Sequence, residues 1–369
     1  MNKHSWTYKK LSEVCDVEYG TRVVKKRDEG EIYPVYGGGG ATFKMNRFNR
    51  ENRVVISRFA MSPKCTRWVE GKFYLNDSGL TLKSNDKSLN QSFLDCCVLS
   101  LNDKIYSFGR GVAQKNLKVE DLINLVIPIP SKDEQETIVA ELDEINETIE
   151  MLKQQVADLD KLEQSIFYTM FGDPVTNEKG WEVKKLGDLA IIGTGATPSR
   201  TKEDIYYNGN IPWVKTTEVH YEDIEDTEEK ITAIAVEETN CKIYPEGTIL
   251  MAMYGQGKTR GQIAKLKIRA TTNQACAAID LSQSSCEIDF IYCHLKLMYE
   301  HIRSMARGGN QANLNLSLVN SILIINPPLV LQQEFAAKAE AIESAKAELN
   351  AQIAEMQTLL ASRMDYYFD

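Results

Sequence analysis

The segment closest to a catalytic motif is Ala252-Met253-Tyr254-Gly255-Gln256-Gly257-Lys258-Thr259. It fits a relaxed phosphate-binding loop in which alanine replaces the first glycine. Such a loop must open a helix, because the amides of the helix N-terminus hold the phosphate. The residues that follow, 261–268, alternate apolar and polar side chains as a strand does. This pattern argues against nucleotide binding, and a nucleotide-dependent enzyme that uses Lys258 is kept only as an alternative.

A second motif, Asn326-Pro327-Pro328-Leu329, follows an apolar stretch and is similar to the Asn-Pro-Pro-aromatic motif of amino-methyltransferases. The aromatic residue that would stack on a flipped base is missing. We interpret the motif as a stop between a strand and a helix, with a methylating enzyme as the alternative. Gly193-Thr194-Gly195 also lacks the third glycine of a dinucleotide fingerprint.

The eight cysteines contain no Cys-x-x-Cys pair, and the four histidines are scattered along the chain. We expect free thiols that mostly fill the core, and no metal site. His294 and His301 lie seven residues apart, and this spacing predicts that they share one helix face. No Ser/His/Asp grouping stands out.

Basic side chains point instead to nucleic acid, although the net charge is −9. Residues 44–72 hold eight basic side chains and two acids, and residues 254–270 hold five basic side chains and no acid. Lysine and arginine neutralise phosphates, whereas arginine, asparagine and glutamine also pair with base edges. A solvated charged face fits the same stretches. Trp213 and Tyr254 fit a stacking role or a place in the core.

The chain repeats itself. Trp6-Thr7-Tyr8-Lys9-Lys10-Leu11 recurs as Trp181-Glu182-Val183-Lys184-Lys185-Leu186, and Gln114-Lys115-Asn116-Leu117 recurs as Gln311-Ala312-Asn313-Leu314. Each copy of the second element precedes an apolar strand that ends in proline. A duplicated architecture follows from this order.

Each proline stop leads into a long predicted helix. Residues 138–159 carry apolar side chains at alternating spacings of four and three, as a coiled-coil seam does. Ser131 and Glu134 predict a capping box, and Gly172-Asp173-Pro174 predicts the end of a helix about 60 Å long. The second helix, after Pro328, has a less regular stripe richer in alanine. We expect the two helices to pack antiparallel within the molecule.

The segments between these helices are rich in Val, Ile, Thr, Tyr and Gly, which predicts strand-rich mixed domains. The expected fold is α+β, with a first domain at residues 1–130, a long helix at 131–172, a second domain at 173–328 and a second long helix at 329–369. No signal-peptide pattern and no apolar run of about 20 residues occurs. We therefore expect a cytoplasmic protein.

The ordered, duplicated motifs resemble the specificity subunits of type I restriction-modification systems, and the resemblance covers essentially the whole chain. It implies two target-recognition domains held apart by long helices, each reading half of a bipartite DNA site. It also implies no catalysis or cofactor in this chain. The implied partners are double-stranded DNA, two modification subunits that bind S-adenosylmethionine, and restriction subunits that use ATP and magnesium.

The resemblance places DNA contacts by region rather than by atom. Gly37–Gly40, the basic stretch after it, and the blocks around Thr216 and Asn273 lie where the family binds DNA. The two Arg-Gly turns, at Arg110 and Arg307, present cations or serve packing. The candidate DNA-binding residues are Tyr36, Lys44, Arg47, Arg50, Arg53, Arg58, Lys64, Arg67, Arg110, Lys115, Lys215, Thr216, Thr217, Tyr254, Lys258, Arg260, Asn273, Gln274, Arg307 and Asn310.

One further alternative comes from another class of protein. A coiled-coil scaffold or adaptor without DNA specificity also explains the long helices. It differs from a specificity subunit in one observable property, because it would show no salt-sensitive binding to DNA.

Overall fold

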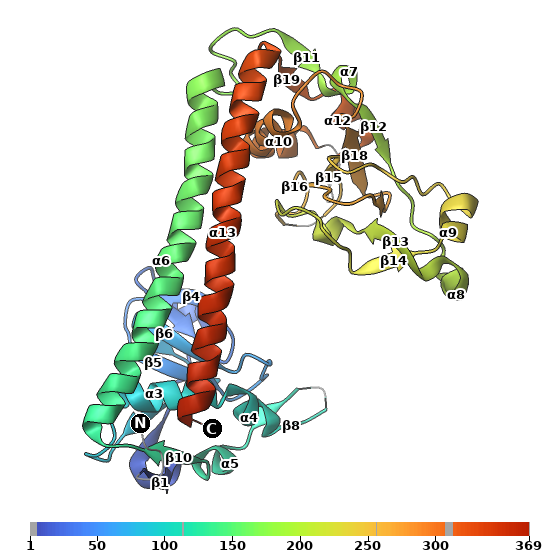
Figure 1. The fold of residues 1–369 in the computed structure, drawn as a ribbon. Helices are drawn as coiled ribbons and strands as arrows, with labels where there is room; N and C mark the ends of the chain where they lie inside the picture. The colour runs from blue at the N-terminus through green and yellow to red at the C-terminus, as the bar shows by residue number, and fades with distance from the viewer. Residues whose placement is uncertain (1–5, 113, 256, 307–312, 369) are drawn as a thin grey trace. The chain divides into compact units, whose positions relative to one another are not determined.

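The computed structural model describes residues 6–112, 114–255, 257–306 and 313–368. The chain forms two units, Met1–Gln154 with Asn350–Asp369, and Gln155–Leu349 (Figure 1). Each unit combines sheets with short helices and includes part of both long helices. Within the described residues, no helix is both long enough and apolar enough to cross a membrane.

The first unit is built on a six-stranded sheet with the order β2-β7-β5-β6-β3-β4 (Figure 1). Its strands are β2 Cys15–Tyr19, β3 Tyr33–Tyr36, β4 Ala41–Met45, β5 Arg50–Ser57, β6 Thr66–Leu75 and β7 Gly79–Ser84. Only β3 and β6 pair in parallel, and the other pairs are antiparallel. Val54, Val55 and Ile56 are all buried, so the middle of β5 is covered on both faces.

Short helices and strands surround this sheet. They are β1 Thr7–Lys10, α1 Leu11–Val14, α2 Lys25–Asp28, α3 Gln91–Ser100, α4 Asn102–Ser107, β8 Gly109–Arg110, β9 Asn116–Leu117, α5 Val119–Ile123 and β10 Val126–Ile129. Helix α3 begins at the N-cap Asn90, whose side chain accepts a hydrogen bond from the Ser92 N–H. Its buried residues Phe93 and Leu94 share one apolar core with Val54 and Leu80 of the sheet.

The second unit has a four-stranded sheet, β12-β18-β15-β16, and a three-stranded sheet, β14-β13-β17. The strands are β12 Ile191–Thr194, β13 Tyr207–Val214, β14 Glu229–Ile231, β15 Ile249–Ala252, β16 Ile263–Lys265, β17 Thr271–Thr272 and β18 Cys276–Asp280. The remaining elements are β11 Val183–Lys185, α7 Leu186–Leu189, α8 Glu203–Tyr206, α9 Ala233–Glu238, α10 Ile288–Leu297, α11 Tyr299–Met305, α12 Leu316–Asn320, β19 Leu323–Ile325 and the 3-10 turns Arg200–Lys202 and Thr216–Glu218.

The repeated sequence motifs form the same structure in both units. The Trp-x-x-Lys-Lys-Leu strand pairs antiparallel with the proline-ended strand, as β1 with β10 and as β11 with β19. Leu11 N–H donates to the Leu125 carbonyl at 2.8 Å, and Leu186 N–H donates to the Ile322 carbonyl at 2.8 Å. The predicted duplication is therefore confirmed at the level of individual hydrogen bonds.

Both long helices are present, as α6 Lys132–Phe171 and α13 Leu329–Phe368, each 40 residues and about 60 Å long. The predicted capping box is confirmed. The Ser131 hydroxyl accepts from Glu134 N–H at 3.4 Å, and the Glu134 carboxylate accepts from Ser131 N–H at 3.1 Å. The helix ends before Gly172, whose φ of +78° is easily reached only without a side chain.

The two helices run antiparallel in each unit. In the first unit, Arg363 near the end of α13 forms an ion pair with Glu141 near the start of α6, at 2.9 Å. In the second unit, Lys346 forms an ion pair with Asp160 at 2.9 Å, and the Phe335 ring packs edge-on against Phe167. Later residues of one helix thus meet earlier residues of the other, which confirms the predicted orientation.

The predicted seam is buried only in part. Ile138 and Leu142 belong to the apolar core of the first unit, whereas Phe167, Phe171 and Phe335 belong to that of the second. Between them, Val156 and Leu159 are partly exposed. The apolar stripes therefore serve as core for the recognition domains as well as for pairing between the helices.

A buried glutamine joins each domain to its long helix. Gln135 is 0% exposed; it accepts from Asn90 N–H at 2.8 Å and donates to the carbonyls of Ser88 and Pro130. Gln332, 2% exposed, accepts from Glu287 N–H at 3.1 Å and donates to the Pro327 carbonyl. Because these groups are buried, their hydrogen bonds fix the start of each helix on its domain.

Candidate DNA interface

Strands β5 and β15 lead into loops that are held by the same backbone hydrogen bonds in both units. In the first unit, Arg58 N–H donates to the Ser78 carbonyl at 2.8 Å, and the Arg58 carbonyl accepts from Leu117 N–H at 2.9 Å. In the second unit, Met253 N–H donates to the Ala275 carbonyl at 2.8 Å, and the Met253 carbonyl accepts from Leu314 N–H at 3.0 Å. Arg58 and Met253 are therefore equivalent positions.

We call the residues after these positions the recognition loops, which are residues 59–65 in the first unit and residues 254–255 and 257–262 in the second. The repeated Gln-x-Asn-Leu element contacts the residue before each loop through the backbone N–H of Leu117 or Leu314. In the first unit it adds two bonds, from Met61 N–H to the Lys115 carbonyl at 2.9 Å and from Ala60 N–H to the Asn116 side chain at 3.3 Å. Lys115, Asn116 and Leu117 of the first copy and Leu314 of the second thus hold a loop in place.

Three predicted cations gather at the first recognition loop. The Arg58 guanidinium lies over the Tyr19 ring at 4.8 Å and over the Phe59 ring at 4.7 Å. Arg67 donates to the Gly38 carbonyl at 2.8 Å and to the Lys64 carbonyl at 3.3 Å. The Gly-rich segment and the basic loop, which are separate in sequence, are therefore joined by Arg67.

The remaining predicted residues of the first unit lie elsewhere on the domain. Arg50 is largely committed to the fold, through the Thr81 hydroxyl at 2.9 Å and an ion pair with Glu18 at 3.6 Å. Arg53 lines a hollow with Arg50, Asn49 and Lys83. Lys44 and Arg47 are exposed, Tyr36 packs on Phe73, Arg110 pairs with Asp121, and the Lys115 ammonium lies over the Tyr106 ring.

In the second unit, Tyr254 and Lys258 are exposed on the recognition loop, and Arg260 is half-buried at its end. Arg303 braces the loop by donating to the Arg260 carbonyl at 3.1 Å and the Gly257 carbonyl at 2.8 Å. Trp213, for which the sequence left open a stacking role or a place in the core, is buried and donates its indole N–H to the Ala196 carbonyl. Trp213 therefore belongs to the core, and Tyr254 belongs to the surface.

The block around Thr216 and Asn273 forms a turn more than an open surface. Asn273 accepts from the Thr216 hydroxyl at 3.2 Å and from Ala275 N–H at 3.0 Å. The Gln274 side chain accepts from Thr197, and Thr217 is exposed. Lys215 forms ion pairs with Glu228 at 2.5 Å and Glu229 at 3.2 Å, and the hydrogen bond to Glu228 raises the pKa of its ammonium group. Its charge is thus largely compensated.

Arg307 and Asn310, with Gln311 and Ala312 of the repeated element, lie outside the described residues. Phe59 and Tyr19, whose rings contact the Arg58 guanidinium, were not predicted from the sequence as contact residues. A signal was present, since Phe59 follows the cation at the end of an apolar strand. That signal is weak, because a single exposed aromatic side chain is common on any protein surface.

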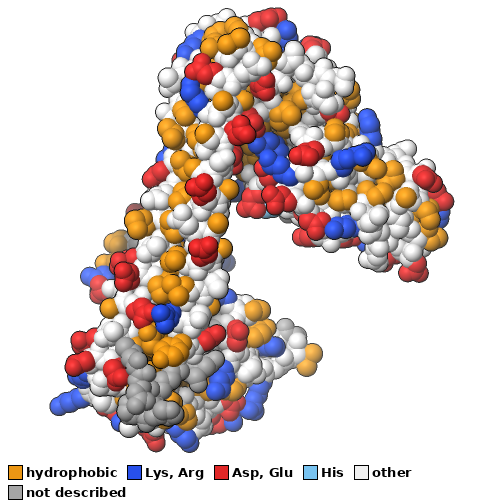
Figure 2. Space-filling model, in the orientation of Figure 1, with side chains coloured by type: hydrophobic (Ala, Val, Ile, Leu, Met, Phe, Trp, Pro, Cys, Tyr) orange, Lys and Arg blue, Asp and Glu red, His pale blue; other side chains and the backbone are white. Residues whose placement is uncertain are grey.

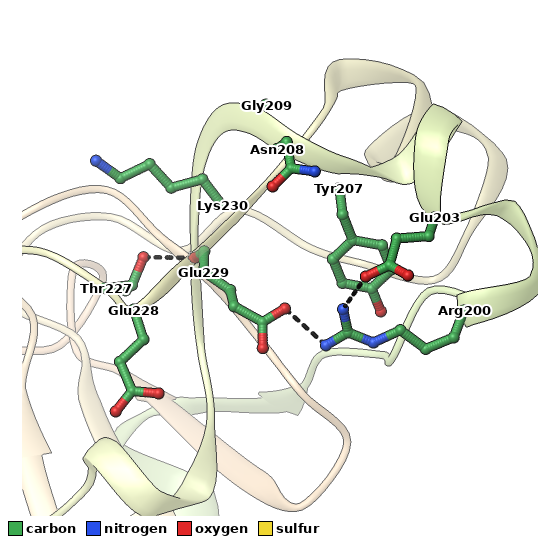
Figure 3. Close-up of a pocket in the computed structure, with 9 residues that line it drawn as sticks. All are labelled: Arg200, Glu203, Tyr207, Asn208, Gly209, Thr227, Glu228, Glu229 and Lys230. Atoms are coloured by element: carbon green, nitrogen blue, oxygen red, sulfur yellow. Dashed lines mark hydrogen bonds and ion pairs between the residues drawn. The ribbon is translucent and has the colours of Figure 1, made fainter.

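A hollow in the second unit is lined by residues of α8, β13, β14 and the adjoining turns, and five of them are charged: Arg200, Glu203, Glu228, Glu229 and Lys230 (Figure 3). Arg200 extends into it and pairs with Glu203 at 3.0 Å and Glu229 at 2.6 Å, above the Tyr207 ring. Two carboxylates neutralise the one arginine, so the hollow offers no net positive charge to a phosphate.

The motifs that resembled catalytic ones have structural roles. The segment after the loop resembling a phosphate-binding loop forms strand β16, as predicted, and not a helix. Asn326 N–H donates to the Glu182 carbonyl at 2.7 Å. This bond joins the end of β19 to the residue before β11, in the repeated Trp-x-x-Lys-Lys-Leu motif. His294 and His301 lie on different helices, α10 and α11, because the chain turns at Met298, so the prediction of one shared helix face is wrong.

All eight cysteines are free thiols, and six of them are buried. Among the described residues, no group of three or more His, Cys, Asp or Glu side chains is placed to hold a metal ion. On the face drawn in Figure 2, acidic and apolar side chains follow the two long helices and basic ones are few. Two exposed candidate cations for DNA lie on the recognition loops, Lys64 in the first unit and Lys258 in the second.

The fold and these loops define a protein with two DNA-recognition domains on a pair of antiparallel helices. The family model described as type I restriction modification DNA specificity domain matches residues 3–161 and again residues 178–356. The chain belongs to this family. It is a DNA sequence-recognition subunit of the type I restriction-modification class, and the resemblance drawn from the repeated motifs is confirmed.

Individual relatives agree. The chain is 27% identical over 368 residues to the type I restriction enzyme MjaIX specificity subunit of Methanocaldococcus jannaschii, covering 89% of this chain and 85% of that one. It is 23% identical to the EcoR124I/EcoR124II specificity subunit of Escherichia coli, covering 97% and 92%. The solved S subunit from M. genitalium has the same fold, with a TM-score of 0.59 at 19% identity, covering 99% and 96%.

Proposed function

We propose that each domain of this chain reads one half of a bipartite DNA site, and that the chain performs no chemistry itself. The duplicated recognition loop is the observation that supports the first part. Two loops are held by the same hydrogen bonds, but their side chains differ from one domain to the other. Two similar frames with different contact residues suit an asymmetric site in which each half has its own sequence.

Chemistry is then left to partner subunits. The proposed partners are two modification subunits that carry S-adenosylmethionine and restriction subunits that use ATP and magnesium. A duplicated chain offers two similar surfaces, which suits recruitment of two copies of one partner. One solved structure of similar fold, at a TM-score of 0.56 and 16% identity, is titled as describing complex assembly of the type I R-M system. We place the protein in the cytoplasm because the DNA that it is proposed to bind is the cell's own.

The predicted contact residues remain a proposal by region. Within it, the structure supports Arg58, Lys64 and Arg67 in the first domain and Tyr254, Lys258 and Arg260 in the second, because each set gathers at one loop. Arg50 and Lys215 have weaker support, since both are engaged with carboxylates of their own domain.

The decisive experiment is to co-express the chain with a type I modification subunit from the same organism and map methylated sites by single-molecule sequencing. A split motif with two fixed halves is expected. Exchanging residues 12–130 for the equivalent domain of a relative should change one half only, and exchanging residues 187–328 should change the other. A soluble, active complex that methylates a single unsplit motif would contradict the division of labour.

The long helices are proposed to set the gap between the half-sites. Inserting seven residues between Gln154 and Gln155, and seven between Leu349 and Asn350, lengthens both antiparallel helices by about 10 Å. The gap should then grow by up to about 3 base pairs at 3.4 Å each. The half-sites themselves should stay the same. Altered half-sites with an unchanged gap would show that the helices do not act as a ruler.

A further inference from the structure

Each recognition loop begins with an exposed aromatic ring. Phe59 is 38% exposed and Tyr254 is 43% exposed. Single exposed apolar side chains are ordinary on protein surfaces and need no explanation. These two differ from a chance pair because they occupy the same structural position, one residue after Arg58 and Met253, in two domains whose local sequences have little in common.

The backbone that presents each ring is fixed on both sides. Arg58 N–H donates to the Ser78 carbonyl, and Met253 N–H donates to the Ala275 carbonyl. The carbonyls of Arg58 and Met253 accept from Leu117 N–H and Leu314 N–H, respectively. Below the first ring, Gly38 approaches the Phe59 carbonyl so closely that an added Cβ atom would lie 2.8 Å from it. A ring held outward on a rigid backbone loses little conformational entropy when it binds.

The stretch of chain that carries each ring has cations and no acidic residue. Arg58, Lys64 and Arg67 fall within residues 58–69 without an acidic residue, and residues 254–270 carry five cations without one. In the second domain the neighbouring segment, residues 215–248, holds ten acids and three bases, and it would repel a phosphate backbone. Tyr254 thus lies on a stretch of that domain suited to DNA.

We propose that Phe59 and Tyr254 are equivalent DNA contacts, each packing its ring against the sugar and base edges of the half-site read by its own domain. The flanking cations would bind phosphates, while the ring replaces water at an apolar base edge, such as that of thymine. This assignment rests on the proposed function, since it presumes that each domain binds one half-site.

The test uses the complex with the modification subunit and duplexes that carry the mapped site. Two further duplexes have one half-site scrambled. The variants are Phe59→Ala and Tyr254→Ala. Their matched controls are Trp68→Ala and Ile205→Ala, which remove apolar side chains 49% and 47% exposed on the same two domains. Tyr254→Phe asks whether the ring alone is sufficient.

On the intact site, Phe59→Ala and Tyr254→Ala are each expected to weaken binding about 10-fold, within the range of one lost base contact. On the duplex whose matching half-site is scrambled, each variant should bind like the wild-type complex, because that contact is already lost. Tyr254→Phe and both controls should stay within about 2-fold of wild type.

Two results would overturn the assignment. One is binding of the intact site by both alanine variants within 2-fold of wild type; the other is an equal loss on all three duplexes, which would mean a contact that ignores the half-site. Failure of the proposed function looks different, because the wild-type complex itself would then bind the intact and scrambled duplexes equally. Since both rings are exposed, melting temperatures of the variants should match those of the controls.

Discussion

The two domains share a frame and differ in what is attached to it. Residues 37–49 connect β3 to β5, and residues 215–248 connect the equivalent strands β13 and β15. The first connection has two basic residues and no acid, whereas the second is far longer and has ten acids and three bases. Hydrogen bonds of the frame are repeated, so the insertions, not the frame, give each domain its own charge.

The frames also differ at equivalent buried positions. In the second domain, His294 accepts a hydrogen bond from the backbone N–H of Ile325 at 3.1 Å. In the first domain the equivalent positions hold Cys97 and Pro128. Proline has no N–H, so no acceptor is needed opposite it. Both pairs of residues therefore avoid an unpartnered backbone N–H at this position, because Ile325 N–H donates to His294 and proline has no N–H.

The largest effect is expected at the glutamines that join domains to helices. Gln135→Leu and Gln332→Leu each leave buried backbone groups without partners, at about 1–3 kcal/mol for each group. Each variant should lose about 3 kcal/mol of unfolding free energy in its own unit, measured by hydrogen exchange resolved by peptide. The exposed neighbour Gln333→Leu serves as control. If only one of the two substitutions lowered the unfolding free energy, the two equivalent glutamines would not contribute equally to stability.

The His294 pair gives the next effect. His294→Cys alone leaves the Ile325 N–H unsatisfied and should cost about 1–3 kcal/mol of unfolding free energy. Adding Ile325→Pro copies the first domain and removes that donor, so the double variant should be more stable than the sum of the two single changes. Denaturant unfolding of the four proteins measures this coupling. Strict additivity would show that the two positions are independent.

Opposite dependences on pH are expected in the two units. Burial lowers the pKa of His294 to about 3, so the folded unit binds fewer protons than the unfolded chain between pH 3 and 6.5. Its stability should fall by about 2 kcal/mol as pH drops from 6.5 to 5. Burial raises the pKa of Asp95 in the first unit to about 7. The folded first unit therefore keeps a proton that the unfolded chain has lost, and its stability should fall as pH rises from 5 to 7.

Hydrogen exchange at pH 5, 6 and 7, corrected for intrinsic exchange rates, separates the two trends by peptide. Asp95→Asn should abolish the trend in the first unit and leave the second unchanged. If both units lost stability in the same direction, the two buried groups would not be the dominant titrating sites.

The smallest effect concerns the difference in surface charge. Lys44→Gln with Arg47→Gln removes two exposed cations from the basic connection of the first domain. DNA affinity of the complex should fall a few-fold on any sequence, and the salt slope should drop by about 2 if both bind phosphate. Lys230→Gln, in the acidic connection of the second domain and paired with Asp226, should change neither quantity. If both sets of substitutions changed DNA affinity and salt slope equally, the two connections would not differ in their electrostatic contribution to DNA binding.

Much of the architecture could be predicted because it depends on local patterns. The capping box at Ser131, the stop at Gly172 and the four-three spacing after Ile138 act within a few residues of the chain, and they predicted helix α6. The candidate site was harder to predict. Arg50, Arg58 and Lys215 look alike in sequence, yet one pairs with Glu18, one lies between two rings and one is held by Glu228.

By itself, the sequence determined the duplication, the two long helices and the regions of basic charge, because periodicity, caps and repeated motifs need no distant partner. Only the tertiary structure decided which loop residues are equivalent. Phe59 and Tyr254 follow connections of unequal length, residues 37–49 and 215–248, and the repeated motifs do not align them. Hydrogen bonds to the Ser78 carbonyl and from Leu117 N–H, or to the Ala275 carbonyl and from Leu314 N–H, place the residues before the two rings at equivalent positions. These partners are distant in the chain, so only the folded structure brings them together.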